Sequence, residues 1–181
     1  MHKYLFIFFF SILITNTNAN NKEKIIDNLN NTNNLIFDFE QNINGKIENG
    51  TCIIEYPKKI FCKYKKNNKI LISNGKSLVI KTTSIYYRYP LKKTPLDLIL
   101  DKNFIINKIY DLKETTIDKS YINYTIIEND NKIDIFFDNQ TFNLIGWQTK
   151  DIYQNITVTL LYSISINQEI NKKLFKLPAQ N

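Results

Sequence analysis

Two pairs of carboxylates are the residues of this chain whose types and spacing could do chemistry. Asp97 and Asp101 stand four positions apart, and so do Asp134 and Asp138. Two nearby carboxyl groups can act as acid and base in hydrolysis. The chain has 17 acidic residues, however, so pairs at this spacing also arise by chance. A hydrolase that uses such a pair stays an alternative, and we expect the protein not to be an enzyme.

Missing residue types exclude most other chemistry. His2 is the only histidine and Met1 the only methionine. Ser-His-Asp and Cys-His catalysis, His-ligated zinc and the usual haem ligation therefore lack their residues in the rest of the chain. The four glycines are widely separated, so the sequence contains no phosphate-binding loop of the nucleotide-binding kinds. We expect no cofactor, no metal site and no nucleic-acid partner.

The first nineteen residues have the pattern of a secretory signal peptide. Lys3 supplies a positive charge, residues 4–14 form an apolar run, and Thr17-Asn18-Ala19 ends in small residues where a signal peptidase cleaves. The apolar run is shorter than the roughly 20 residues that a membrane-spanning helix needs. We predict cleavage after Ala19 and export to the periplasm. Residues 20–181 suit one hydrophobic core and are predicted to form a single domain.

The hydrophobic pattern predicts a mainly β protein that starts with a helix. A one-sided apolar stripe predicts an amphipathic helix over residues 20–35. Its members are Ile25, Ile26, Leu29 and Leu35. Farther along, apolar residues alternate with polar ones, which is typical of strands. The predicted strands cover residues 37–43, 51–56, 60–64, 70–73, 78–82, 85–89, 109–114, 121–127, 132–137, 144–150 and 156–162.

Only one later segment has a helical pattern. Thr94 is a suitable N-cap and Pro95 suits the first helical position, so we predict a short helix over residues 94–101. A meander of this many strands curls into a barrel or splits into a sandwich. Two short helices cannot fill a wide barrel, so we expect a partly empty apolar interior. A solid β-sandwich is the alternative.

Short motifs follow one another along almost the whole predicted domain. They are Phe39-Glu40-Gln41, Gly50 followed by Tyr56-Pro57, Ser73-Asn74-Gly75-Lys76-Ser77-Leu78, Tyr89-Pro90-Leu91, Thr94-Pro95-Leu96, Gly146-Trp147 with Asp151, and Leu174-Phe175 with Pro178. In this order and spacing the chain resembles the periplasmic outer-membrane lipoprotein carrier (LolA) family. The resemblance implies an incomplete, unclosed antiparallel β-barrel of about 10–11 strands, with two or three helices and a helical lid over an apolar cavity.

The same resemblance implies a function without catalysis. Carriers of this family take the acyl chains of lipoproteins from an inner-membrane ABC transporter and deliver them to the outer membrane. We therefore predict a monomeric periplasmic chaperone. Its partners would be acylated lipoproteins, the lipoprotein-releasing transporter, and the outer membrane or an acceptor there. The alternative is a lipid- or lipoprotein-binding sensor domain of an envelope stress pathway, a role that related half-barrels have.

Strand parity and the two helices predict which residues line the cavity. If Ile54 and Tyr56 point inward, then Ile60 and Tyr64 do so on the next strand. The predicted lining residues are Ile25, Leu29, Phe37, Phe39, Ile54, Tyr56, Ile60, Tyr64, Leu78, Ile80, Tyr87, Tyr89, Leu96, Ile99, Leu100, Ile133, Ile135, Phe137, Trp147, Val158 and Leu160.

Cys52 and Cys62 are predicted to form a disulfide. Pairing Glu55 with Lys59 around the turn at Pro57 places the two cysteines opposite each other on one face. The periplasm is oxidising, which favours the bond. Two buried free thiols are the alternative.

One position departs from the family pattern. Well-studied carriers have an Arg before the hairpin Pro that hydrogen-bonds the lid, whereas this chain has Tyr56 there and its only Arg is Arg88. We predict that the Tyr56 hydroxyl replaces that bond with a weaker one to a lid carbonyl. The alternative is that its ring only packs against Leu96 and its hydroxyl meets water. Lys58 and Lys59 are expected to be solvated turn residues, with contact to anionic lipid or an acidic docking face as the alternative.

Overall fold

The computed structural model describes residues 20–117, 120–151 and 153–179. The predicted signal peptide and its cleavage site after Ala19 lie outside these residues. The helices are α1 (Asn21–Asn31), α2 (Leu96–Ile99) and α3 (Lys102–Asp111), with short 3-10 helices η1 (Leu91–Lys93) and η2 (Lys172–Phe175). The strands are β1 (Asn34–Ile43), β2 (Lys46–Glu55), β3 (Lys59–Tyr64), β4 (Ile70–Asn74), β5 (Ser77–Lys81), β6 (Tyr86–Pro90), β7 (Thr115–Ile117), β8 (Tyr121–Glu128), β9 (Asn131–Asp138), β10 (Leu144–Lys150) and β11 (Ile156–Ile166).

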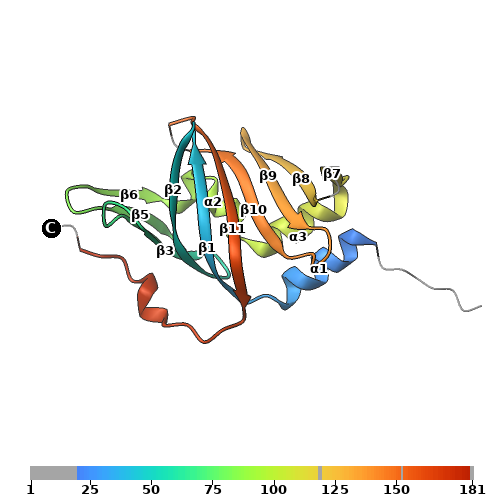
Figure 1. The fold of residues 1–181 in the computed structure, drawn as a ribbon, viewed down its shortest axis with the longest axis horizontal. Helices are drawn as coiled ribbons and strands as arrows, with labels where there is room; N and C mark the ends of the chain where they lie inside the picture. Colours follow the sequence, from blue (N-terminus) through green and yellow to red (C-terminus); the bar gives the residue numbers. More distant parts are fainter. Residues whose placement is uncertain (1–19, 118–119, 152, 180–181) are drawn as a thin grey trace, which may run out of the picture.

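In the described part of the chain, eleven strands form a single sheet. Their order is β6-β5-β4-β3-β2-β1-β11-β10-β9-β8-β7, with every pair antiparallel. The edge strands β6 and β7 are not paired with each other, so the barrel is open. Figure 1 shows one strongly curved layer, with α3 passing behind β9 and β10. The predicted unclosed barrel is confirmed, and the solid sandwich of two packed sheets is wrong.

The predicted N-terminal helix is confirmed in a shorter form. Asn20 and Glu23 make a capping box, in which each side chain accepts the backbone N–H of the other residue, at 3.0 and 3.3 Å. The buried face of α1 consists of Ile25, Ile26 and Leu29. Leu35 belongs to β1 and not to the helix, because its burial follows the two-residue alternation with Phe37.

The strand predicted over residues 109–114 is wrong, because its first residues belong to helix α3. Ile105, Ile106 and Ile109 recur at helical spacing and are all buried. The Asp101 side chain accepts the backbone N–H of Phe104 at 3.2 Å and caps this helix. Ile109 was assigned with the residues after it to a strand, so the helical stripe of Ile105, Ile106 and Ile109 was not predicted. Helix α3 therefore fills one end of an interior that was predicted to be partly empty.

Two lysines tie α1 and α3 together at opposite ends. Lys22 Nζ donates to the carbonyls of Tyr110 and Leu112, at 3.0 and 2.9 Å, where α3 ends. Lys102 Nζ donates to two carbonyls at the end of α1, at 3.0 and 2.7 Å. Each cation meets carbonyls that a helix end leaves without intrahelical partners, and it complements the helix dipole there. The two helices are therefore held as a rigid pair.

We expect Lys102→Met to lower the free energy of unfolding by about 1 kcal/mol, since it removes two charge-assisted hydrogen bonds at a partly exposed site but keeps the apolar stem. Urea denaturation measures this loss. Lys63→Met is the control, because Lys63 is an exposed lysine of β3; it should change stability by less than about 0.5 kcal/mol. Equal effects of the two variants would contradict the tie between the helices.

The disulfide predicted between Cys52 and Cys62 is present. The register of β2 and β3 pairs Glu55 with Lys59 and Cys52 with Cys62, as the turn at Pro57 suggested. The inward residues of the two strands, Cys52, Ile54, Ile60, Cys62 and Tyr64, are buried, whereas their outward neighbours are exposed or only partly buried. The parity reading of this hairpin is confirmed.

A C-terminal strap, residues 167–179, leaves the end of β11 and passes along the β3–β6 end of the sheet (Figure 1). Its helix η2 packs on β3 and β4, and Phe175 is buried. The Tyr86 hydroxyl of edge strand β6 donates to the Pro178 carbonyl at 3.2 Å. The strap therefore stabilises this end of the sheet.

Candidate functional site: a lidded apolar cavity

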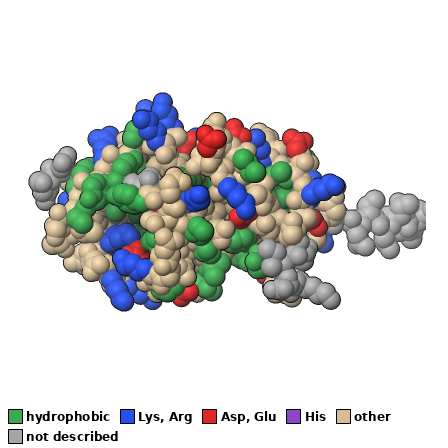
Figure 2. Space-filling model, turned by 90° about the horizontal axis from the view of Figure 1, so that it is seen from above, with side chains coloured by type: hydrophobic (Ala, Val, Ile, Leu, Met, Phe, Trp, Pro, Cys, Tyr) green, Lys and Arg blue, Asp and Glu red, His purple; other side chains and the backbone are tan. Residues whose placement is uncertain are grey.

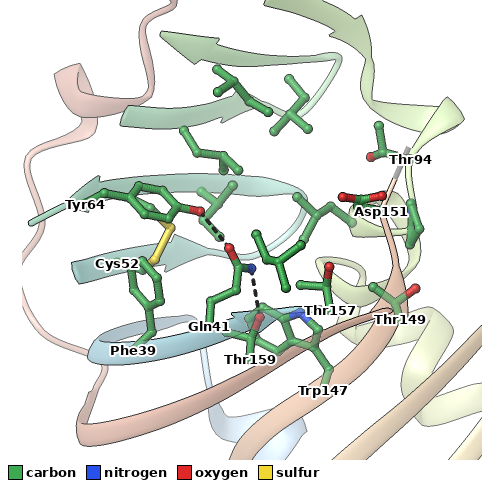
Figure 3. Close-up of a pocket in the computed structure, with 18 of the residues that line it drawn as sticks. Phe39, Gln41, Cys52, Tyr64, Thr94, Trp147, Thr149, Asp151, Thr157 and Thr159 are labelled. Carbon is green, nitrogen blue, oxygen red and sulfur yellow. Dashed lines mark hydrogen bonds between the residues drawn. A yellow bond between two sulfur atoms is a disulfide. The ribbon is translucent and has the colours of Figure 1, made fainter. Parts of the chain in front are cut away.

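A cavity of about 320 Å³ lies within the curve of the sheet, beside α2. This volume is at the lower end of the range for small-molecule sites. Figure 3 looks into it. The lining residues come from β1 to β6, from β10 and β11, and from the segments around α2. They are Phe39, Gln41, Ile43, Cys52, Ile60, Cys62, Tyr64, Lys69, Leu71, Leu78, Ile80, Tyr87, Tyr89, Thr94, Pro95, Leu96, Trp147, Thr149, Lys150, Asp151, Tyr153, Thr157 and Thr159.

The apolar wall of the cavity continues to the molecular surface at the β6 edge. Tyr87 lines the cavity and is still 46% exposed, and Ile85 beside it is 43% exposed. Hydrophobic side chains are visible at the surface of this end of the molecule, on the left in Figure 2. An apolar ligand would therefore meet an apolar surface before it enters.

Nine of the predicted lining residues lie in the cavity wall. They are Phe39, Ile60, Tyr64, Leu78, Ile80, Tyr87, Tyr89, Leu96 and Trp147. Whether they contact a ligand stays a prediction.

Ten other predicted lining residues do not line the cavity and pack in or against the hydrophobic core. They are Ile25, Leu29, Phe37, Ile54, Tyr56, Ile99, Leu100, Ile133, Ile135 and Phe137. The reason is helix α3, whose Ile105, Ile106 and Ile109 belong to the same core. The helix occupies space that an empty barrel would have left to a ligand.

Val158 and Leu160 were predicted to point inward, and this is wrong. The inward positions of β11 are Thr157 and Thr159, which are buried and line the cavity, while Leu160 is 37% exposed. The prediction chose the more apolar set of alternate residues. This strand instead presents hydroxyl groups to the interior.

Gln41 is the central polar residue of the wall, and sequence reasoning missed it. Tyr64 Oη donates to Gln41 Oε1 at 3.3 Å, and Gln41 Nε2 donates to Thr159 Oγ1 at 3.0 Å (Figure 3). Burial, together with the nearby Glu48 carboxylate, raises the pKa of Tyr64, so its hydroxyl remains a donor. Gln41 follows Phe39 by two positions, so strand alternation could have placed it in the wall.

Lys58, in the turn between β2 and β3, holds the lid, which we define as residues 91–100. Its backbone N–H donates to the Leu100 carbonyl at 2.8 Å. Its Nζ lies 3.0 Å from Asp97 Oδ1 and 3.5 Å from Asp101 Oδ2. We call Lys58, Asp97 and Asp101 the lid latch. The expectation that Lys58 is a solvated turn residue is wrong, because two aspartates distant in sequence fold back onto it.

Lys59 and Thr94 also differ from the expectations. Lys59 Nζ lies 2.9 Å from Glu55 Oε2, so it is ion-paired on its own hairpin. The Thr94 hydroxyl donates to the Leu91 carbonyl at 2.8 Å and therefore does not cap α2. It fixes the turn through which the chain enters the lid helix.

The Tyr56 hydroxyl does not take part in the latch. It is buried and has no hydrogen-bond partner among the residues that the structure describes. Burial also raises its pKa. The predicted bond from Tyr56 to a lid carbonyl is wrong, since the Leu100 carbonyl receives the Lys58 N–H instead.

Tyr56→Phe should therefore leave lid opening unchanged and keep or slightly raise stability, by up to about 1 kcal/mol, because it removes a buried hydroxyl without a partner. Amide hydrogen exchange across residues 94–101 is the measurement. Tyr110→Phe, at a 61% exposed position, is the control with no expected effect. Faster exchange of the lid in Tyr56→Phe, but not in Tyr110→Phe, would show that the Tyr56 hydroxyl does help to hold the lid.

Both carboxylate pairs have structural partners. Asp97 and Asp101 belong to the latch. Asp134 accepts hydrogen bonds from a threonine hydroxyl and a glutamine amide. The backbone N–H of Thr141 holds the pKa of Asp138 below its usual value by bonding the charged form. Neither pair lines the cavity.

The fold and the site together define an open antiparallel half-barrel with an apolar cavity beside a short helix. No helix in the described residues is long and apolar enough to span a membrane. The model of the family described as outer membrane lipoprotein carrier protein LolA matches residues 30–178. The chain belongs to this family.

The solved structures that match this chain have little sequence in common with it. A LolA superfamily protein from Nitrosomonas europaea is 9% identical, with 88% of this chain and 99% of that chain covered and a TM-score of 0.43. A DUF1329 family protein from Desulfovibrio piger is 8% identical, with coverages of 86% and 95% and a TM-score of 0.44. The Pseudomonas aeruginosa MucA/MucB complex contains a chain that is 9% identical, with coverages of 88% and 62% and a TM-score of 0.39. No curated protein sequence gives a significant match.

Proposed function

We propose that this protein is a periplasmic carrier that binds the acyl chains of lipoproteins released from the inner membrane and delivers them to the outer membrane. The observation that carries this proposal is the apolar cavity beneath a latched lid. Membership of the LolA family supports it. The signal peptide in residues 1–19 would export the chain, and the carrier would bind without reacting, so the protein is proposed not to be an enzyme.

The physics of lipid transfer explains why such a carrier is needed. Burying a methylene is worth about 0.8 kcal/mol. Three acyl chains with roughly 40 methylenes would therefore resist leaving a membrane by about 30 kcal/mol. A cavity that buries most of this surface again lowers the barrier to crossing water, and a lid that opens allows entry and exit without covalent chemistry.

The lid must open for the cargo to fit. A methylene is about as large as a water molecule, which needs at least about 10–15 Å³ of cavity volume, so roughly 40 methylenes need at least about 400–600 Å³. The cavity with the lid latched offers about 320 Å³. We infer that the structure shows the closed form and that cargo binding spreads the lid from the sheet.

The test is native mass spectrometry of the protein purified from its own periplasm. A triacylated lipoprotein that copurifies, and is lost from a Leu96→Glu variant, is the expected result. A protein partner without acyl chains would favour the sensor function instead. Copurification of neither, after crosslinking in cells, would contradict the carrier proposal.

A further inference from the structure

The cavity has one apolar wall and one wall that offers hydrogen bonds. Strands β3, β4 and β5 supply the apolar wall, with Ile60, Leu71, Leu78 and Ile80. Across β1, β11 and β10, the register sets Gln41 opposite Thr159 and Thr159 opposite Trp147. We call Gln41, Thr159 and Trp147 the donor row. In the next row, β11 and β10 continue the polar wall with Thr157 and Thr149, while β1 contributes the apolar Ile43.

The donor row has hydrogens to spare. Gln41 uses one N–H for Thr159 Oγ1 and retains a second, while Thr159 accepts that bond and keeps its own O–H. Trp147 carries an indole N–H, a donor only. In the described part of the chain none of these three hydrogens has an acceptor. Thr159 and Trp147 are 3% and 4% exposed and Gln41 is partly exposed, so only water inside the cavity can reach these hydrogens, and a ligand would displace it.

This arrangement favours a ligand that places a hydrogen-bond acceptor next to the donor row. A plain hydrocarbon laid on the donor row would bury polar hydrogens without partners, which is unfavourable. An ester or amide carbonyl oxygen is an acceptor only, and its two lone pairs can take hydrogen bonds from two of the three donors. A carboxylate fits the donor row less well, because the three donors are neutral and offset less of the cost of removing a charge from water.

We propose that the donor row binds the ester or amide carbonyl of an acyl group while the hydrocarbon packs on β3, β4 and β5. The cavity thereby selects acyl esters and amides over chains without a carbonyl. This inference rests on the proposed function in so far as the ligand is acylated, and it adds which part of the ligand is recognised and by which residues.

The test compares two probes that differ only in the carbonyl. They are 1-monomyristoylglycerol, an ester, and 1-O-tetradecylglycerol, the ether with the same chain length and headgroup. Affinities are measured by displacement of an environment-sensitive dye from the delipidated protein. We expect the ester to bind about two- to twelvefold more tightly than the ether, which is the range for one neutral hydrogen bond.

The variants assign the preference to the donor row. Thr159→Val and Gln41→Leu, which remove donors at nearly constant volume, should bring the ratio of the two affinities close to one. Thr51→Val, on the exposed side of β2, is the matched control and should keep the ratio of the unaltered protein. Thermal unfolding of each variant is measured alongside, and the isosteric Thr159→Val is decisive if Gln41→Leu unfolds.

The outcomes separate this inference from the proposed function. Equal binding of ester and ether by the unaltered protein overturns the inference and leaves a carrier of hydrocarbon chains. A preference for the ester that persists in Thr159→Val and Gln41→Leu also overturns it. If neither probe binds, the proposed function and the inference fail together.

Discussion

Leu96→Glu is expected to weaken binding of 1-monomyristoylglycerol by about a hundredfold. Leu96 lies in the lid and lines the cavity. A carboxylate there would lose water against an apolar ligand, at a cost of several kcal/mol, and tenfold in affinity corresponds to about 1.4 kcal/mol. The probe is uncharged, so repulsion between headgroup and protein does not contribute. Isothermal titration calorimetry with the delipidated protein gives the affinity.

Two comparisons test whether the loss of affinity comes from the charge placed in the cavity. Lys93→Glu places a carboxylate on the exposed side of the same lid and should leave affinity nearly unchanged. Lowering the pH toward 4 should partly restore binding to Leu96→Glu, because protonation removes the charge of the introduced glutamate and desolvation by the ligand raises its pKa. A loss of thermal stability as large as the loss of affinity would mean that Leu96 is an ordinary core residue.

Lys58→Met should raise the open population of the lid about five- to thirtyfold. Lys58 makes charge-assisted contacts with Asp97 and Asp101 at partly exposed positions, and losing them costs about 1–2 kcal/mol. Amide exchange across residues 94–101 should accelerate by that factor, and the dissociation of bound acyl chains should accelerate with it. Lys59→Met, which removes an ion pair from the same hairpin without touching the lid, is the control. Unchanged lid exchange in Lys58→Met would show that the latch contributes nothing.

The latch should also weaken in alkali. Burial by itself lowers the pKa of Lys58, but the hydrogen bonds and charges of Asp97 and Asp101 outweigh it and raise the pKa above 10.5. A cation whose pKa is raised by folding stabilises the folded form below its ordinary pKa, and this contribution disappears as the pH rises through the raised value. The difference in lid protection between the unaltered protein and Lys58→Met should therefore be constant near neutral pH and vanish above pH 10.5.

Local pattern was enough to predict the sheet but not the helix inside it. The register of the hairpin around Pro57 was predicted to the residue, although its strand ends were not, because a short turn fixes register and alternation then fixes the facing of Cys52 and Cys62. Helix α3 was missed because Ile109 fits both a helical and a strand period over so short a segment. Because α3 was not predicted, Ile133, Ile135 and Phe137 were assigned to the cavity wall, whereas they lie in the hydrophobic core.

The functional site was predictable where it is apolar. Leu78, Ile80, Tyr87 and Tyr89 were placed correctly, since strand alternation on β5 and β6 sets which side chains face the cavity. The polar wall was missed because hydrophobicity was used to choose lining residues. The latch had no sequence signal, because Lys58 and Asp97 are 39 positions apart and only the folded lid brings them together.

The position of β1 between β2 and β11 has a consequence for the order in which the molecule assembles. β2 follows β1 directly, but the other partner pairs residues as distant as Leu35 and Ile166. Contacts between segments so far apart form late, because the loop between them must close first. The hairpin of β2 and β3 can fold and be oxidised early, while one side of β1 stays open until β11 emerges. A chain threaded through a secretion channel would thus remain extensible during translocation and complete its sheet only after β11 has crossed.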